Sequence, residues 1–304
     1  MRTFRSNGKL LLTAEYLVLD GARALALPTK LGQSLTVEKI DQPHIHWKSF
    51  DVNSDLWFEH VYPKNLFSTK LSDHQSVISK RLKELLISSK QLNEKFLTTN
   101  GGFNVSTNLE FPNNWGLGSS STLVNNIAQW AKVDPYQLLK NTFGGSGYDI
   151  ACANSNHPIS YCIQSLDGTI CATSIAFNPC FKEELFFIHL NKKQDSREGI
   201  KYYKTRNQNL SPYIKDINAI SNNMIHCKSL LEFEELLVKH ESLISKLLNL
   251  PTVKSLLFHD YPRAVKSLGA WGGDFVLATG NLTDMNYFHD KGYTTIVPYS
   301  EMIL

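Results

Sequence analysis

The chain has 304 residues, of which 42% are hydrophobic and 19% are charged, and its formal net charge is +3 from 31 basic and 28 acidic side chains. This composition is typical of a globular protein and excludes an intrinsically disordered chain. Because the two signs of charge nearly balance, neither nucleic acid nor an anionic membrane is expected as the main partner. The length suits two packed domains.

The five cysteines form no CxxC pair and have no metal-ligand spacing with the ten histidines. An odd count without a disulfide framework predicts free thiols in a reducing compartment. The scattered histidines favour surface or hydrogen-bonded roles over zinc binding. The basic N-terminus lacks the apolar core of a signal peptide, and no stretch reaches the about 18–20 apolar residues of a membrane span. We therefore expect a soluble, cytoplasmic protein.

The first half of the chain changes pattern near residue 76. Before it, short alternating apolar segments predict strands at 10–12, 16–19, 24–28, 34–40, 45–50 and 56–61. After it, Ile78, Leu82 and Leu85 fall on one helical face, which predicts an amphipathic helix over 76–96. A strand is expected next, at 103–111.

The second half alternates helical stripes with short apolar strands. We expect strands at 185–190, 275–279, 285–289 and 294–297, helices at 196–206, 213–224 and 230–250, and a Gly-rich loop at 266–273. We find no repeat and no disordered linker. The sequence predicts a mixed α+β chain of two domains, 1–182 and 183–304.

A Gly/Ser loop joins the strand at 103–111 to the next helical stripe. A helix N-terminus attracts phosphate through its unpaired N–H groups and its partial positive charge, and glycines allow close approach. The segment does not match the Walker loop, and Ser121 stands where the dinucleotide fingerprint has its third glycine. Taken alone, a flexible connection explains it equally well.

Two other Gly-rich segments carry a carboxylate. Asp149 follows the turn at 145–148, where an ordinary N-cap is the simplest explanation, although a half-buried carboxylate also suits catalysis. Asp274 ends the loop 269–274, which either forms a β-turn or, beside Lys266, wraps a phosphorylated ligand. Neither segment decides a function by itself.

The order of these segments resembles the GHMP kinases. Gly8–Tyr16 is similar to the opening PGK-x-x-x-x-GE motif, with Asn7 for proline and Ala14 for glycine. The other three motifs are P-x-x-x-GLGSS, Gly-Ser-Gly-x-Asp and Gly-Ala-x-Gly-Gly-Asp, and they follow in the family's order. The Glu15-Tyr16 pair and the Gly-Gly-Asp ending are most similar to phosphomevalonate kinases, with mevalonate itself kept open as substrate.

The resemblance implies a fold, a reaction and a set of site residues. The fold is an N-terminal domain like ribosomal protein S5 domain 2 and a C-terminal ferredoxin-like domain, and the reaction is phosphoryl transfer from ATP, with Mg²⁺, to a small anionic acceptor by a monomer or homodimer. The catalytic residues implied are Asp149 and Lys9. The residues implied to bind ATP are Pro112, Gly116, Leu117, Gly118, Ser119, Ser120 and Ser121, with Ser120 also touching the metal. Those implied to bind substrate are Glu15, Tyr16, Ser146, Gly147, Gly269, Ala270, Trp271, Gly272, Gly273 and Asp274.

Two departures from the family pattern keep alternatives open. Leu138 stands near the position of the mevalonate kinase metal ligand, so Asp134, another group or the serine alone would serve the metal. Trp271 is bulkier than the usual glycine and would narrow the acceptor pocket or stack on a ligand. The alternatives are a GHMP kinase for a sugar or homoserine, and a non-catalytic ligand-binding protein with this fold.

Overall fold

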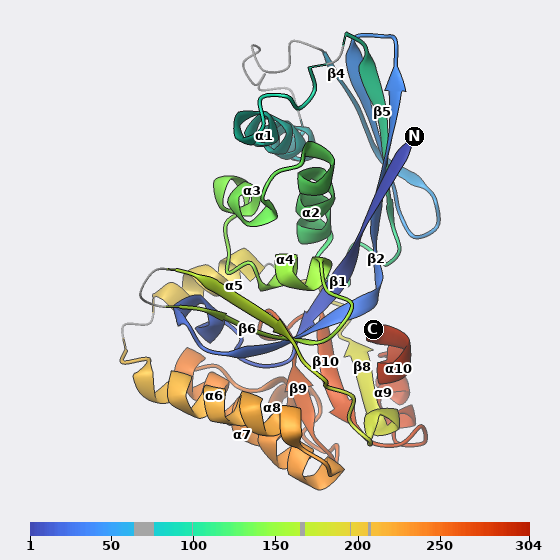
Figure 1. The fold of residues 1–304 in the computed structure, drawn as a ribbon. Coiled ribbons are helices and arrows are strands. Elements are labelled where there is room, and N and C mark those ends of the chain that lie inside the picture. The colour runs from blue at the N-terminus through green and yellow to red at the C-terminus, as the bar shows by residue number, and fades with distance from the viewer. Residues whose placement is uncertain (64–75, 99, 165–167, 195, 206–207) are drawn as a thin grey trace. The chain divides into compact units, whose positions relative to one another are not determined.

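The computed structural model describes residues 1–63, 76–98, 100–164, 168–194, 196–205 and 208–304 (Figure 1). The chain forms two compact units, each discontinuous in sequence. Unit 1 comprises Met1–Gly8, Leu31–Asn113 and Leu117–Asn154, and unit 2 comprises Lys9–Lys30, Asn114–Gly116 and Ser155–Leu304. The predicted division at residue 182 does not coincide with these units, because strands β1 (Arg2–Leu11) and β2 (Ala24–Ile40) contribute to both. The mixed α+β class is confirmed.

Unit 1 contains a sheet in the order β4-β3-β5-β2. Its further strands are β3 (His44–Phe50), β4 (Leu56–Pro63) and β5 (Gly102–Leu109). β3 runs parallel to β5, whereas β3–β4 and β2–β5 are antiparallel, with Val37 opposite Val105. Burial alternates along β3, so that Ile45 and Trp47 face the core, as the period-two pattern predicts.

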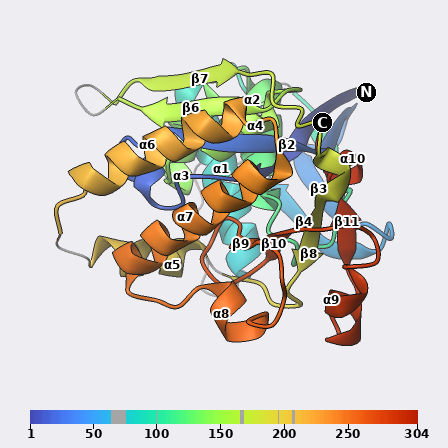
Figure 2. The ribbon, with the colours of Figure 1, turned by 90° about the horizontal axis from the view of Figure 1, so that it is seen from below.

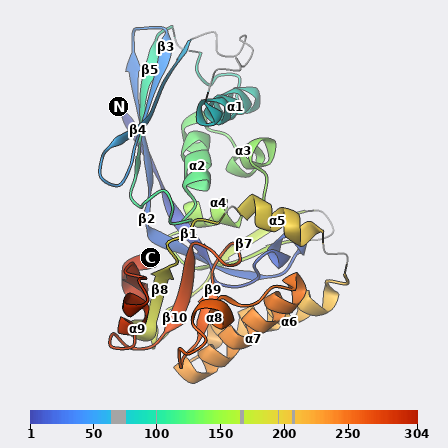
Figure 3. The ribbon, with the colours of Figure 1, turned by 180° about the vertical axis from the view of Figure 1, so that it is seen from behind.

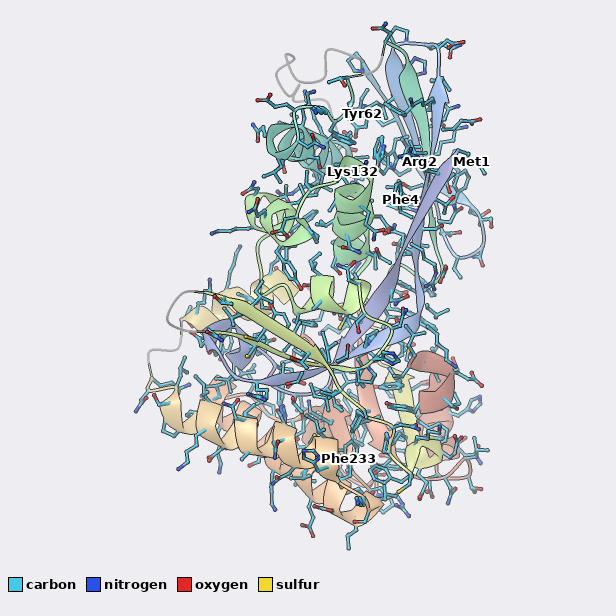
Figure 4. The ribbon with its side chains drawn as sticks, in the orientation of Figure 1. Met1, Arg2, Phe4, Tyr62, Lys132 and Phe233 are labelled. Carbon is cyan, nitrogen blue, oxygen red and sulfur yellow. The ribbon has the colours of Figure 1, made fainter. Side chains whose placement is uncertain are left out.

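Four helices lie on one face of the unit 1 sheet (Figures 1 and 3). They are α1 (Val77–Leu92), α2 (Ser119–Ala131), α3 (Pro135–Thr142) and α4 (Tyr148–Ala153). α1 begins where Ser76 accepts a hydrogen bond from the Ser79 N–H, and Leu82 and Leu85 on its inner face are buried. Tyr62, labelled in Figure 4, donates its hydroxyl to the Ser79 carbonyl over 2.9 Å.

Unit 2 contains a second sheet, in the order β11-β8-β10-β9, and all of its strand pairs are antiparallel. The strands are β8 (Leu185–His189), β9 (Val265–Ser267), β10 (Phe275–Thr279) and β11 (Ile296–Pro298). All residues of β8 and β10 are buried, which explains why both are continuous apolar runs in the sequence. A hairpin of β6 (Ile159–Ile163) and β7 (Ile170–Ser174) extends from the N-terminal part of β2, with β6 paired to it.

The described part of unit 2 also contains six α-helices. They are α5 (Ser196–Lys204), α6 (Ser211–His226), α7 (Leu230–Leu248), α8 (Val253–Leu257), α9 (Asn286–Asp290) and α10 (Tyr299–Met302). α6 and α7 lie side by side (Figure 2). Phe233, labelled in Figure 4, is fully buried on α7 and packs 5.1 Å from the Phe181 ring. None of the helices in the described ranges combines the length and apolarity that a bilayer crossing needs.

Two predicted strands are wrong. The segment 16–19 falls in a 3₁₀ helix, Leu17–Asp20, because Ala14 and Tyr16 have positive φ angles of 67° and 61° that break an extended backbone. The segment 285–289 belongs to helix α9 rather than to a strand. The β6–β7 hairpin and helices α8 and α10 were not predicted, because all of them are short and lack a clear period.

Candidate active site

The predicted site residues belong to both units. In unit 1, helix α2 begins after Gly118, whose φ is +91°, and no side chain caps its first N–H groups. Ser120 is exposed at this end, whereas Ser121 is buried and donates its hydroxyl to the Gly118 carbonyl over 2.8 Å. Ser121 therefore shapes the loop, while Ser120 presents a hydroxyl beside uncapped amides that suit an anion.

Asp149 lies in the first turn of α4, after Gly147 at φ +85°. Its carboxylate is half-buried and accepts a hydrogen bond from the Ile150 N–H at 3.2 Å. Its charge also acts on Tyr136, a residue that sequence reasoning missed. Burial first, and then the charges of Cys152, Asp134 and Asp149, raise the pKa of Tyr136 to about 12. Tyr136 thus keeps its proton and can donate a hydrogen bond near the predicted catalytic carboxylate.

In unit 2, three predicted residues that are far apart in sequence come together. The Lys9 ammonium donates to the Gly116 carbonyl over 2.9 Å. Gly116 has a φ of +63°, and a Cβ built on it would lie 2.1 Å from Asp274 Oδ2. Only glycine allows both this backbone conformation and this close approach. The first and fourth motifs therefore contact the phosphate loop at one backbone position.

Neighbouring aromatic side chains hold this part of the loop. The Nε2 atom of His189, on β8, lies 3.1 Å from the Asn114 carbonyl oxygen. The His189 ring lies 5.0 Å from the Phe275 ring. The Trp115 ring packs edge-on to Phe275 at 5.3 Å. Because His189 and Phe275 are both buried, residues 114–116 are anchored on the β8–β10 sheet.

Asp274 lies within a cationic environment. Its Oδ1 accepts a hydrogen bond from the Gln194 N–H at 3.2 Å. Burial raises the pKa of Asp274 above its usual range, although the Gln194 N–H and the positive charges of Lys9 and Lys193 oppose the rise. The sequence motif predicted Lys9 here, but nothing in the sequence linked Gln194 or Lys193 to Asp274.

The third loop, 269–274, is fastened by two aromatic side chains. The Trp271 N–H donates to the Tyr16 hydroxyl over 2.9 Å, and the indole Nε1 donates to the Pro251 carbonyl over 3.0 Å. The Trp271 side chain is only 7% exposed, so it packs into unit 2 and does not present a face for ligand stacking there. Gly199 on α5 allows the contact, because a Cβ on it would lie 2.5 Å from the Tyr16 hydroxyl.

Glu15, predicted to bind substrate, lies in a buried charged cluster of unit 2. Its carboxylate forms an ion pair with Lys266 and lies 3.1 Å from His240 Nε2. Burial alone would raise the pKa of Glu15, but the charges of Lys266 and His240 outweigh it and hold the pKa below its usual value. Lys266 is fully buried, so it does not face a ligand, as one of the two alternatives for the third loop would require. His240 and Glu241, on α7, were not foreseen because long-range pairing leaves no local pattern.

The described residues contain no group of three or more His, Cys, Asp or Glu side chains that could hold a metal by themselves. Mg²⁺ needs no such group, since it commonly takes one or two protein oxygens together with water and substrate phosphates. The exposed Ser120 hydroxyl, beside amides that suit phosphate, fits that pattern. Asp134 caps α3, accepting from the Tyr136 N–H at 2.9 Å, and Leu138 is fully buried.

The fold is that of known small-molecule kinases. The chain matches mevalonate kinase from Methanococcus jannaschii with a TM-score of 0.70 and 15% identity, over 97% of this chain and 96% of that one. It matches Streptococcus pneumoniae phosphomevalonate kinase, in complex with phosphomevalonate and AMPPNP, with a TM-score of 0.70 and 16% identity, over 98% and 100%. The chain has the GHMP kinase fold.

The same fold also serves a sugar kinase. Lactococcus lactis galactokinase, complexed with galactose, matches with a TM-score of 0.68 and 12% identity, over 99% of this chain and 93% of that one. No protein-family model and no curated protein matches the sequence. At these identities the GHMP fold is established, and the acceptor must be argued from the residues of this chain.

Proposed function

We propose that this protein is an ATP-dependent kinase that phosphorylates a small anionic acceptor, 5-phosphomevalonate or mevalonate, in isoprenoid precursor synthesis. The observation that carries the proposal is the meeting of Lys9, Gly116 and Asp274 in unit 2. These residues come from three separate motifs, and their contact places a lysine and a carboxylate beside the backbone of the proposed phosphate loop.

The N-terminus of α2 is the proposed binding site for the ATP phosphates. Its uncapped N–H groups follow Gly118, which has no side chain to cover the start of the helix. The Lys9 ammonium, which donates a hydrogen bond to the Gly116 carbonyl, adds positive charge at the start of this loop. Ser120 would hold Mg²⁺, which when bound neutralises phosphate charge.

Asp149 is the proposed catalytic carboxylate. If the acceptor is an alcohol, Asp149 orients the hydroxyl and takes its proton as the oxygen attacks the γ-phosphorus of ATP. If the acceptor is a phosphate, its oxygen is already ionised, and Asp149 only positions it. Loss of a general base typically costs about 10²–10⁴ in rate.

An anionic acceptor is favoured by the charge around the third loop. Lys9 and Lys193 both act on Asp274 at the end of this loop, and Lys192 and Lys193 are exposed. Gly269 and Gly272 are partly exposed, and no atom would lie within 4 Å of a Cβ on either, so an acceptor can approach the loop backbone there. A neutral sugar would gain little from these lysines, whereas a carboxylate or phosphate would gain charge-assisted hydrogen bonds.

The test is ADP release from ATP and Mg²⁺ with 5-phosphomevalonate, mevalonate, galactose and homoserine as separate acceptors. We expect turnover with 5-phosphomevalonate or mevalonate, and a fall of about 10²–10⁴ in kcat for Asp149→Asn with mevalonate as acceptor. Asp41→Asn is the matched control, because Asp41 is an exposed carboxylate of the same unit.

The outcomes separate the alternatives. Turnover confined to galactose or homoserine would support the proposed kinase activity but reject 5-phosphomevalonate and mevalonate as its acceptors. ATP binding without turnover of any acceptor would reject the proposed activity and favour a ligand-binding role. Equal activity of Asp149→Asn and the Asp41→Asn control would reject the role of Asp149.

A further inference from the structure

Two cysteines face each other across the β6–β7 hairpin of unit 2. Cys162 on β6 and Cys171 on β7 are register partners in an antiparallel ladder, so both side chains lie on the same face (β6 and β7 are adjacent in Figure 2). The Gln164 N–H donates to the Thr169 carbonyl over 2.9 Å. Pairs alternate along such a ladder, so 162 and 171, two positions farther on, are also a hydrogen-bonded pair.

That pairing has the Cα spacing that a disulfide needs. Hydrogen-bonded partners in antiparallel strands have Cα atoms about 5.5 Å apart, inside the roughly 4.4–6.8 Å range of disulfides. The Cβ atoms of hydrogen-bonded partners lie at the wide end of the about 4.5–5.5 Å range, beyond the roughly 3.5–4.5 Å of a disulfide, so the two strands must close by about 1 Å to join the sulfurs. Both cysteines are free thiols of intermediate exposure, which a small oxidant can reach.

The surroundings distinguish the two thiols. The Gln164 side-chain amide donates to Cys171 Sγ over 3.2 Å, a contact that favours the thiolate. Burial first, and then the charge and hydrogen bond of Cys171, raise the pKa of Cys162, with Arg23 partly opposing the rise. Burial therefore keeps the Cys162 thiol protonated, and the donor from Gln164 marks Cys171 as the attacking sulfur.

We propose that Cys162 and Cys171 form a reversible cross-strand disulfide when the protein meets a peroxide. The Cys171 thiolate attacks one peroxide oxygen, the O–O bond breaks, and Cys171 becomes a sulfenic acid as hydroxide leaves. Cys162 gives its proton to that hydroxide, and its sulfur then attacks the Cys171 sulfur and expels the second oxygen as hydroxide, which becomes water on protonation. In total, two thiols and one hydrogen peroxide yield one disulfide and two waters, and a dithiol restores the thiols.

The experiment uses the full-length, fully reduced protein treated with hydrogen peroxide. Titration of thiols in denaturant should fall from the five free cysteines to three, since 5 − 2 = 3, and dithiothreitol should restore the original value. Cleavage of the unfolded chain at Asp167 separates the two cysteines, so peptide mass analysis without reduction should find their fragments still joined. No such cross-link forms in Cys162→Ser or Cys171→Ser.

A sulfenic-acid trap, dimedone, tests the order of events. We expect Cys162→Ser to accumulate the dimedone adduct at Cys171, and Cys171→Ser to give far less adduct at Cys162. Cys180→Ser is the matched control and should oxidise as the unaltered protein does, because Cys180 lies on another segment. Five thiols after peroxide treatment, a link between Cys180 and Cys227, or a link only between chains would each overturn the proposal.

Discussion

Glu15 and Lys266 form a fully buried ion pair in unit 2, although they are 251 positions apart in the sequence. The pair ties the motif that opens the chain to strand β9, which leads into the third loop. A charge buried without its partner is costly, so the two residues are expected to depend on one another for stability.

Lys266→Met leaves the Glu15 carboxylate buried without its main counter-charge. We expect a loss of about 3–5 kcal/mol in the free energy of unfolding, measured by urea denaturation. Lys246→Met, which alters an exposed lysine on α7, is the control and should change stability by less than about 0.5 kcal/mol. The double variant Glu15→Gln/Lys266→Met should recover part of the loss, and full additivity of the two single effects would contradict the pairing.

Glu241 makes the stability of the same unit depend on pH. Burial raises its pKa to about 8 in the folded protein, well above the ordinary value near 4.5. The folded state therefore holds a proton that the unfolded chain has released, and this contribution to stability is present at low pH and lost as the pH rises toward 8. The limiting slope for one proton is about 1.4 kcal/mol per pH unit.

Glu241→Gln removes that titration while keeping the shape of the side chain. We expect the variant to gain melting temperature over the unaltered protein at pH 8–9 and to lose this advantage near pH 5, in thermal unfolding followed across that range. Glu235→Gln, an exposed carboxylate on the same helix, should give no such pH-dependent difference. A constant difference at all pH values would show that Glu241 titrates normally.

The Tyr16 hydroxyl is the acceptor for the buried Trp271 N–H. Tyr16→Phe leaves this donor without its acceptor, which should cost about 1–3 kcal/mol of stability. Because the third loop loses the hydrogen bond that holds Trp271, we expect the acceptor KM to increase by a larger factor than kcat decreases. Tyr213→Phe is the control, since Tyr213 is a partly exposed tyrosine of the same unit. A Tyr16→Phe variant with unchanged stability and an unchanged acceptor KM would show that the hydrogen bond does not hold the loop.

The sequence predicted elements and motif order well, but not the long-range pairings. Strand 275–279 matches β10 residue for residue, because a buried apolar run between turns is a local signal. The resemblance brought Lys9, Gly116 and Asp274 forward as candidates, and the structure adds why Gly116 must be glycine. The partners of Glu15 could not be predicted, because no local sequence pattern distinguishes His240 or Lys266 from other helix and strand residues. Their contacts with Glu15 arise only from the fold.

Gly116→Ala tests the contact at the phosphate loop. The added methyl group would lie 2.1 Å from Asp274 Oδ2, and the φ of +63° is itself unfavourable for alanine. Displacing the loop or the carboxylate by about 1 Å should cost roughly 10²-fold in kcat/KM for ATP, measured by ADP release. Gly292→Ala is the matched control, because Gly292 has a φ of +87° but no atom within 4 Å of the added carbon.

The control separates backbone strain from the clash. Both variants carry the unfavourable φ, which costs roughly 1–2 kcal/mol of stability, but only Gly116→Ala forces Asp274 aside. We therefore expect both proteins to fold and only Gly116→Ala to lose activity. Similar activity of the two variants would mean that the approach of Asp274 to Gly116 has no part in nucleotide use, and the proposed site would then lose its central observation.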